Sequence, residues 1–261
     1  MRAIVLSLCV SSTLLSAPND RAADEDAKKK LLDKLTAAII DDPKNAENYA
    51  RRAEFYMKER QFTNAISDWD RCIELEPKNA AYPLQRGMAH FLAGKFAESV
   101  ADFDRELELK PERKNGHWMR GISLYYAGRF DEGRKQFDAY QAKDSNDVEN
   151  AVWHFLCAAK AEGIEKARAG MLKIGKDKRV PMTEVYDLYA GKIKPEDVLK
   201  AAGDEKGPLF YAHLYLGIYA DVMGDPKKAE EHLALAAGKY KIGHYMGEVA
   251  RVHLEVLQAK K

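Results

Sequence analysis

The sequence predicts an all-α protein, built as a right-handed superhelix of stacked helical hairpins, that is, an α-solenoid. Two observations predict this class. Residues of one kind recur every 34 positions through three successive units, and the rest of the chain has helical periodicity without a convincing strand. Self-similarity at a fixed period is typical of repeat proteins, in which each unit buries its apolar flank against the next unit.

Several columns of the repeat agree in all three units. They are Pro43, Pro77 and Pro111; Ala53, Gly87 and Gly121; Phe62, Phe96 and Phe130; Trp69, Phe103 and Phe137; and Asp70, Asp104 and Asp138. The small residue lets one helix approach its neighbour closely, and the large aromatic residue fills the groove between them. Gly94 and Gly128 fall at the bend, where a helix end favours the left-handed conformation, and the prolines fall where the second helix stops. Each unit is therefore expected to form a helical hairpin.

The repeat divides the chain after its first 23 residues into three parts. The stretch 28–45 has the phase of a second helix alone, so 24–147 is expected to hold a half-repeat followed by three full units. The segment 148–205 loses the spacing and is interpreted as a degenerate helical insert. The pattern returns at 210–237, so 206–261 is expected to form a final repeat and a capping helix.

Helical periodicity continues through the insert and the closing segment. Two prolines, Pro181 and Pro195, are expected at helix starts, where proline is favoured. The closing segment 243–258 carries one apolar stripe and is expected to lie across the final repeat. The four short helices expected in the insert span 148–162, 164–174, 181–193 and 195–202, and the stripe consists of Tyr245, Val249, Val252 and Val256.

The 34-residue pattern resembles the tetratricopeptide repeat (TPR). The later stretches VYDLYAGKIKPEDVLKAA (185–202) and HLYLGIYADVMGDPKKAEEHLALAAGKYKIGHYMGEVARVHLEVL (213–257) resemble the C-terminal half of the NlpI family of exported TPR lipoproteins. This resemblance implies a non-catalytic adaptor that docks cell-wall hydrolases or a processing protease and that pairs as a homodimer. The family is anchored through an N-terminal lipidated cysteine, and this chain lacks the signal for that modification.

The N-terminus has the plan of a secretory signal peptide. Residues 1–17 combine one basic residue, an apolar run and a small-residue end, and the run is too short to span a membrane. Cleavage is expected after Ala17 or Ala23, which gives a leader of up to 1–23 and an exported protein, either periplasmic or secreted. The alternative is an N-terminal helix that is kept. Cys9 lies too early for lipidation and follows Leu8, so we expect no lipid anchor.

Composition and motifs favour protein partners over other functions. The chain has 42 basic and 41 acidic residues, so it has no overall field to attract nucleic acid or an anionic membrane surface. The thiols Cys72 and Cys157 have no CxxC spacing and suit neither a disulfide framework nor a zinc site. No nucleophile elbow, phosphate loop or HExxH motif is present. We therefore expect no enzyme activity, cofactor or metal.

An arginine occupies the seventh position of each unit, at Arg52, Arg86 and Arg120. One interpretation is a row of cations that holds an acidic peptide, for which the guanidinium is well suited. The other, which the sequence favours, is that each arginine pairs with an aspartate of the facing helix. Arg120 is the exception, because Gln136 stands where the first two units have Asp68 and Asp102.

The TPR resemblance also implies which residues line the inner, concave surface of the superhelix. In the second and third units these residues are mostly apolar or aromatic, and a contiguous patch of this kind is typical of a binding site. We expect a partner segment, extended or helical, to bind there with Trp118 and Tyr125 as anchors. The expected groove consists of Leu84, Met88, Phe91, Trp118, Ile122, Tyr125 and Tyr126, with Arg120 beside it.

The sequence leaves a second interpretation of this surface open. The insert or the closing helix covers it in that case, so that the groove is filled by the chain itself or by a second protomer. The protein is then a self-assembling structural repeat protein rather than an adaptor of the cell envelope.

Overall fold

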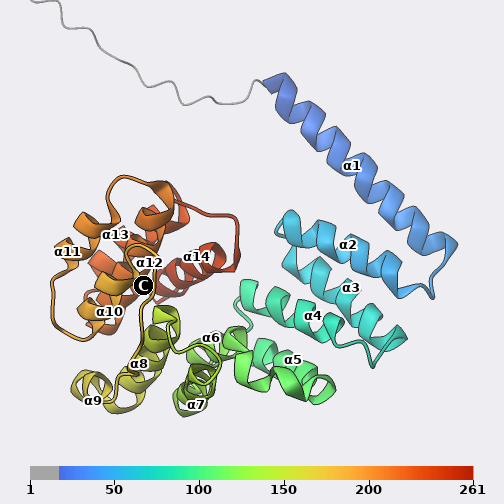
Figure 1. Ribbon diagram of the computed structural model, residues 1–261. Helices are drawn as coiled ribbons and strands as arrows, with labels where there is room; N and C mark the ends of the chain where they lie inside the picture. Colours follow the sequence, from blue (N-terminus) through green and yellow to red (C-terminus); the bar gives the residue numbers. More distant parts are fainter. Residues whose placement is uncertain (1–17, 261) are drawn as a thin grey trace, which may run out of the picture.

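The computed structural model describes residues 18–260, which are folded into helices joined by turns and loops (Figure 1). The proposed leader at 1–17 lies outside the described residues, while the second cleavage position, Ala23, lies within the first helix. No helix between residues 18 and 260 is long and apolar enough to cross a membrane. The helices are α1 (Pro18–Asp41), α2 (Ala46–Lys58), α3 (Phe62–Leu75), α4 (Ala81–Leu92), α5 (Phe96–Leu109), the 3₁₀ helix η1 (Pro111–Gly116), α6 (Trp118–Tyr126), α7 (Phe130–Gln141), α8 (Val148–Glu162), α9 (Ile164–Ala169), α10 (Met182–Tyr189), α11 (Pro195–Ala202), α12 (Lys206–Val222), α13 (Pro226–Ala237) and α14 (Tyr245–Gln258).

Four helical hairpins carry the repeat. They are α2 with α3, α4 with α5, α6 with α7, and α12 with α13, and each pair packs along its length. The bends of the last three hairpins hold Gly94, Gly128 and Gly224 with φ of +73°, +74° and +81°, the conformation expected of glycine at a helix end. In the first hairpin the same place is taken by Arg60, with φ of 58°.

Close approach of the paired helices depends on the small residue of the repeat. A Cβ atom built on Gly121 in α6 would lie 2.6 Å from Cζ of Phe137 in α7, and one built on Gly87 would lie 2.8 Å from the ring of Phe103. Ala53 fills the same place in the first unit and is fully buried. The pairing of small and aromatic residues that the sequence predicts is therefore confirmed.

We expect Gly121→Ala to lower the free energy of unfolding by about 1 to 3 kcal/mol, because a rigid, buried ring would have to move. This loss exceeds the gain of about 1 kcal/mol that alanine brings to a helix. Urea denaturation measures the difference. Gly207→Ala is the matched control, since a Cβ atom on that helical glycine meets nothing within 4 Å. Equal stability of the two variants would contradict the close packing of α6 on α7.

Two elements differ from the expected boundaries. The third unit begins with η1 instead of an α-helix, so α6 starts only at Trp118. Helix α9 ends at Ala169, and residues 170–181 form a loop rather than the rest of a helix. Helix α8 is buried along its length, with every residue from Asn150 to Ala159 inside the protein.

Helix α14 contacts both the last repeat and the first two hairpins. It packs on α13 and also returns to the inner side of the early hairpins (Figure 1). Arg251 in α14 donates from Nη2 to the main-chain oxygen of Leu92 at 3.0 Å, and Arg60 in the first bend donates to Oε1 of Glu248 at 2.9 Å. The two ends of the row of hairpins are therefore joined by the C-terminal helix.

Candidate functional site

The arginines of the repeat pair within the protein. Arg52 donates from Nη2 to Oδ1 of Asp68 at 2.7 Å, and Arg86 donates from Nε to Oδ2 of Asp102 at 2.9 Å. The pairing interpretation is thus confirmed for the first two units. These cations are engaged by the facing helix and are not a free ladder for an acidic peptide.

Arg120, which we expected beside the groove, is also engaged. Its Nε donates to Oδ1 of Asp104 at 2.6 Å, and its Nη1 donates to Oε1 of Gln136 at 3.3 Å. Gln136 thus takes the place of the missing aspartate, and Asp104 of the preceding unit supplies the negative charge.

The inner surface is covered over part of its length by the chain itself. Phe91, Ile122 and Tyr125 are 0%, 1% and 5% exposed. Tyr245 of α14 stacks on Phe91, with ring centroids 5.4 Å apart, and Trp153 of α8 meets Tyr125 edge-on at 5.5 Å. At Phe91 and Tyr125 the second interpretation of the surface applies, because helices of the same chain occupy the place where a partner would lie. Tyr125 in particular is not accessible as an anchor.

Other residues of the expected groove keep some exposure. Leu84, Met88, Trp118 and Tyr126 are all partly exposed. Tyr126 shares a hydrogen bond with Nδ1 of His253 in α14 at 2.8 Å, so it belongs to the contact with the closing helix. Of the expected groove, Leu84, Met88 and Trp118 therefore remain partly exposed outside the contact with the closing helix.

A cavity of about 350 Å³ opens beside Trp118, between the third hairpin, α8, α12 and the start of α14. This volume is in the range of small-ligand sites. Its walls are mainly aromatic: Trp118 and Tyr245 meet edge-on at 5.1 Å between ring centroids, and Phe137 and Trp153 stack at 6.5 Å. The aromatic residues that line it are Trp118, Phe137, Tyr140, Trp153, Tyr211 and Tyr245.

Two carboxylates form the polar wall of this cavity. Asp147 is the N-cap of α8, where its Oδ1 accepts from the main-chain N of Glu149 at 3.0 Å. Glu149 accepts at Oε1 from the hydroxyl of Tyr215 and at Oε2 from Nη1 of Arg179 at 2.6 Å. Both carboxylates are therefore held in place by the start of α8 and by its neighbours.

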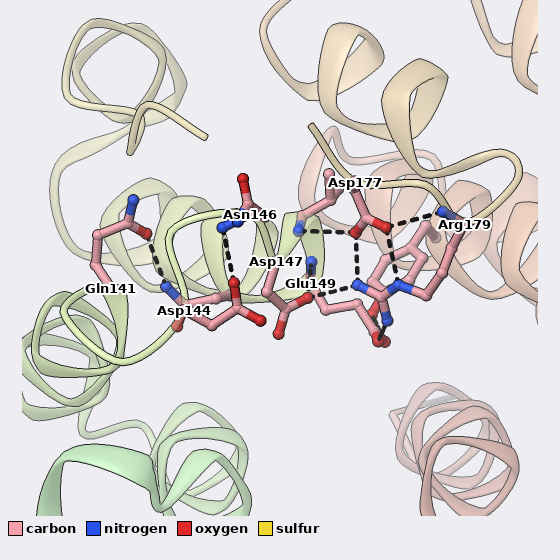
Figure 2. Close-up of polar contacts among 10 residues, drawn as sticks. Gln141, Asp144, Asn146, Asp147, Glu149, Asp177 and Arg179 are labelled. Carbon is pink, nitrogen blue, oxygen red and sulfur yellow. Dashed lines mark hydrogen bonds and ion pairs between the residues drawn. The ribbon is translucent and has the colours of Figure 1, made fainter. Parts of the chain in front are cut away.

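Arg179, in the loop before α10, ties three carboxylates together (Figure 2). It bonds Asp147, Glu149 and Asp177, and Asp177 also accepts from the main-chain N of Val148 at 3.2 Å. Burial acts to raise the pKa of Asp177, but the hydrogen bonds from Arg179 and Val148 lower it below its ordinary value. The loop is fixed in this way to the N-terminus of α8.

Burial dominates at Glu149, where it raises the pKa of the carboxyl above its ordinary value. The hydrogen bond from Tyr215 and the charge of Arg179 act in the other direction without cancelling this effect. A further positive charge near Glu149 would favour its ionised form.

The repeat positions predict one wall of the cavity but not the others. Trp118 and Ile122 follow from the repeat positions, whereas Asp147, Glu149 and Trp153 lie outside the 34-residue phase. One signal was present: α8 is apolar on all sides, which is typical of a helix at the centre of a protein.

No protein-family model and no curated protein matches this chain. The resemblance to the NlpI family therefore has no support from these comparisons, while the repeat itself has support from solved structures.

Solved structures share the architecture at low identity. A tetratricopeptide repeat protein from Parabacteroides merdae matches with a TM-score of 0.52 and 15% identity, over 90% of this chain and 80% of that one. PilW, a type IV pilus biogenesis factor, matches with a TM-score of 0.48 and 16% identity, over 89% and 94% of the two chains. YrrB, described as a TPR protein with an unusual peptide-binding site, matches with a TM-score of 0.46 and 16% identity, over 83% of this chain and 97% of that one. The likeness to the Parabacteroides protein, together with the four hairpins, shows that this chain has the tetratricopeptide repeat fold.

Proposed function

We propose that this protein is a non-catalytic interaction adaptor that holds a segment of a partner protein at the cavity beside Trp118. The observation that carries the proposal is the cavity itself, which is lined by six aromatic rings on the inner side of a rigid helical frame. Tryptophan and tyrosine are enriched among the few side chains that dominate interface energies. A pre-formed site on packed helices also loses little entropy when a partner binds.

We further propose that the adaptor works in the bacterial cell envelope, with other envelope proteins as partners. The support is the signal-like sequence at 1–17. A reporter enzyme that is active only after export, fused after residue 24, should be active in cells. An inactive reporter would place the protein inside the cell and would leave the binding proposal untouched.

Replacing Trp118 with alanine should weaken partner binding by about 30-fold, the loss expected of a central interface residue. Crosslinking in intact cells followed by mass spectrometry measures the yield of each partner. Leu84→Ala is the matched control, because Leu84 lies on the same inner surface but does not line the cavity. Unchanged crosslinks in a folded Trp118→Ala protein would refute the cavity as the binding site.

The second candidate is a structural protein whose own chain fills the groove. The packing of α14 over Phe91 favours it for that part of the surface. Self-assembly is its distinguishing property, and light scattering of the purified protein tests it. A monodisperse monomer supports the adaptor, and a concentration-dependent oligomer supports assembly.

A further inference from the structure

We propose that the cavity beside Trp118 takes the cationic side chain of a lysine or arginine in the bound partner segment. This inference rests on the proposed function and adds the chemistry of the residue that the cavity selects. Three features of the cavity carry it: its aromatic lining, its two carboxylates, and a buried oxygen that lacks a donor.

The aromatic walls suit a cation. The negative face of an aromatic ring attracts ammonium and guanidinium groups, tryptophan most strongly, and the attraction grows when water is excluded. Two tryptophans and three tyrosines line the cavity: Trp118, Trp153, Tyr140, Tyr211 and Tyr245. The long aliphatic stem of lysine or arginine would also pack against these rings while the charged head lies at the polar wall.

Two side chains that line the cavity, Asp147 and Glu149, are acidic. The imidazole of His244 lines it as well, where Nδ1 accepts from the main-chain N of Met246 at 3.2 Å and Nε2 shares a hydrogen bond with the hydroxyl of Tyr211 at 3.3 Å. Arg179 pairs with the two carboxylates from outside the cavity but does not neutralise them, since it is shared with Asp177 as well. Asp147 uses Oδ1 both for the N-cap bond and for Arg179, which leaves Oδ2 as an acceptor for a ligand. A charge-assisted hydrogen bond to this oxygen would be stronger than a neutral one.

A buried acceptor in the cavity wall lacks a partner. Asn150 is 3% exposed, and its Nδ2 donates to the main-chain oxygen of Phe137 at 3.1 Å and to Oε1 of Gln141 at 3.2 Å. These bonds fix the amide, and Oδ1 has no hydrogen-bond partner among the described residues. A buried acceptor without a donor costs about 1 to 3 kcal/mol. Because Oδ1 has almost no accessible surface in this conformation, an ammonium or guanidinium group would supply the missing donor only after the side chains around Asn150 shift.

Other ligand classes fit these features less well. An acidic side chain would face two carboxylates, and an aliphatic or phenylalanine side chain would leave Oδ1 of Asn150 without a donor.

Indole resonances give a direct test, because the chain has three tryptophans and two of them line the cavity. The purified protein is titrated with five-residue capped peptides whose central residue is lysine, norleucine or glutamate. Norleucine keeps the stem of lysine without its charge. We expect the lysine peptide to shift the indole signals of Trp118 and Trp153 but not that of Trp69, and to bind about tenfold more tightly than the norleucine peptide.

Glu149→Gln together with Asp147→Asn, which keeps an N-cap residue, should abolish this difference.

Asp144→Asn is the matched control, because it removes a nearby exposed carboxylate that neither lines the cavity nor bonds Arg179 (Figure 2). This variant should keep the preference for lysine. Equal binding of the lysine and norleucine peptides would overturn the inference while leaving the adaptor function in place. Binding of tetramethylammonium without binding of any peptide would assign the site to a small molecule instead. Indole signals that respond to none of the peptides, together with unchanged crosslinks in Trp118→Ala, would refute the proposed function as well.

Discussion

Replacing Arg86 with alanine is expected to lower the free energy of unfolding by about 3 to 5 kcal/mol. Arg86 bonds Asp102 through Nε at 2.9 Å and Asp70 through Nη1 at 2.6 Å. The side chain of Asp102 is only 4% exposed, so the substitution leaves a buried carboxylate with His90 as its remaining side-chain partner, 2.9 Å from Nδ1. Urea denaturation monitored by circular dichroism measures the loss.

The two aspartates give a matched comparison for this prediction. Both bond the same guanidinium, but the side chain of Asp70 is 48% exposed and that of Asp102 is 4% exposed. Asp70→Asn should cost about 0 to 1 kcal/mol, as exposed ion pairs do. Asp102→Asn should cost clearly more, because water cannot replace the lost charge pairing. Equal costs, or an Arg86→Ala protein of normal stability that has lost a partner, would overturn the structural role of Arg86.

The pair of Arg86 and Asp102 should also affect how the free energy of unfolding falls at acidic pH. Burial acts to raise the pKa of Asp102, but hydrogen bonds from His90 and Arg86 lower it below the ordinary value of 3.8. A carboxyl with a lowered pKa contributes stability that is complete above 3.8 and is lost as the pH falls through its folded-state pKa. In Arg86→Ala the pKa of Asp102 rises, and the contribution of this carboxyl to the loss of stability in acid becomes smaller.

The pairing at Arg86 shows what a repeat allows one to predict. A fixed period places the same two positions opposite each other in every unit. Arg52 therefore pairs with Asp68, and Arg86 pairs with Asp102, and the partners lie 16 residues apart in the sequence in each case. Local packing rules therefore transfer from unit to unit. They fail where a unit departs from the pattern, as in the third unit, where the 3₁₀ helix η1 takes the place of the start of an α-helix.

The 34-residue period does not predict which part of the inner surface is covered. Whether Phe91 is open depends on where α14 lies, and α14 is joined to the second unit only by contacts between distant parts of the chain. Its apolar stripe predicts that the helix packs against something but does not identify the surface. The cavity shows the same limit, since Trp118 follows from the repeat. Asp147 ends the third unit without matching any of its columns, and Asn150 comes from the insert, which has no repeat spacing. Periodicity thus predicts the hairpins and one wall of the site.

Phe91→Ala should lower the free energy of unfolding by about 3 to 5 kcal/mol, the loss expected for a buried aromatic residue. Phe91 is 0% exposed because Tyr245 of α14 stacks on it, with Phe96 and Tyr126 on its other sides. If α14 did not lie on the inner surface, Phe91 would keep its contacts with Phe96 and Tyr126 but would be partly exposed to solvent, and its removal would cost less. The size of the effect therefore reports the position of the closing helix.

A double-mutant cycle isolates the contact between Phe91 and Tyr245. Because the two rings touch, the losses in Phe91→Ala and Tyr245→Ala should not add, with an interaction free energy of about 0.5 to 1.5 kcal/mol. The control cycle pairs Tyr245→Ala with Ile66→Ala, a buried residue of the separate cluster in the first unit, where the losses should add. Additive losses in the first cycle would mean that α14 leaves the groove in solution, and the surface from Phe91 to Trp118 would then be open along its whole length.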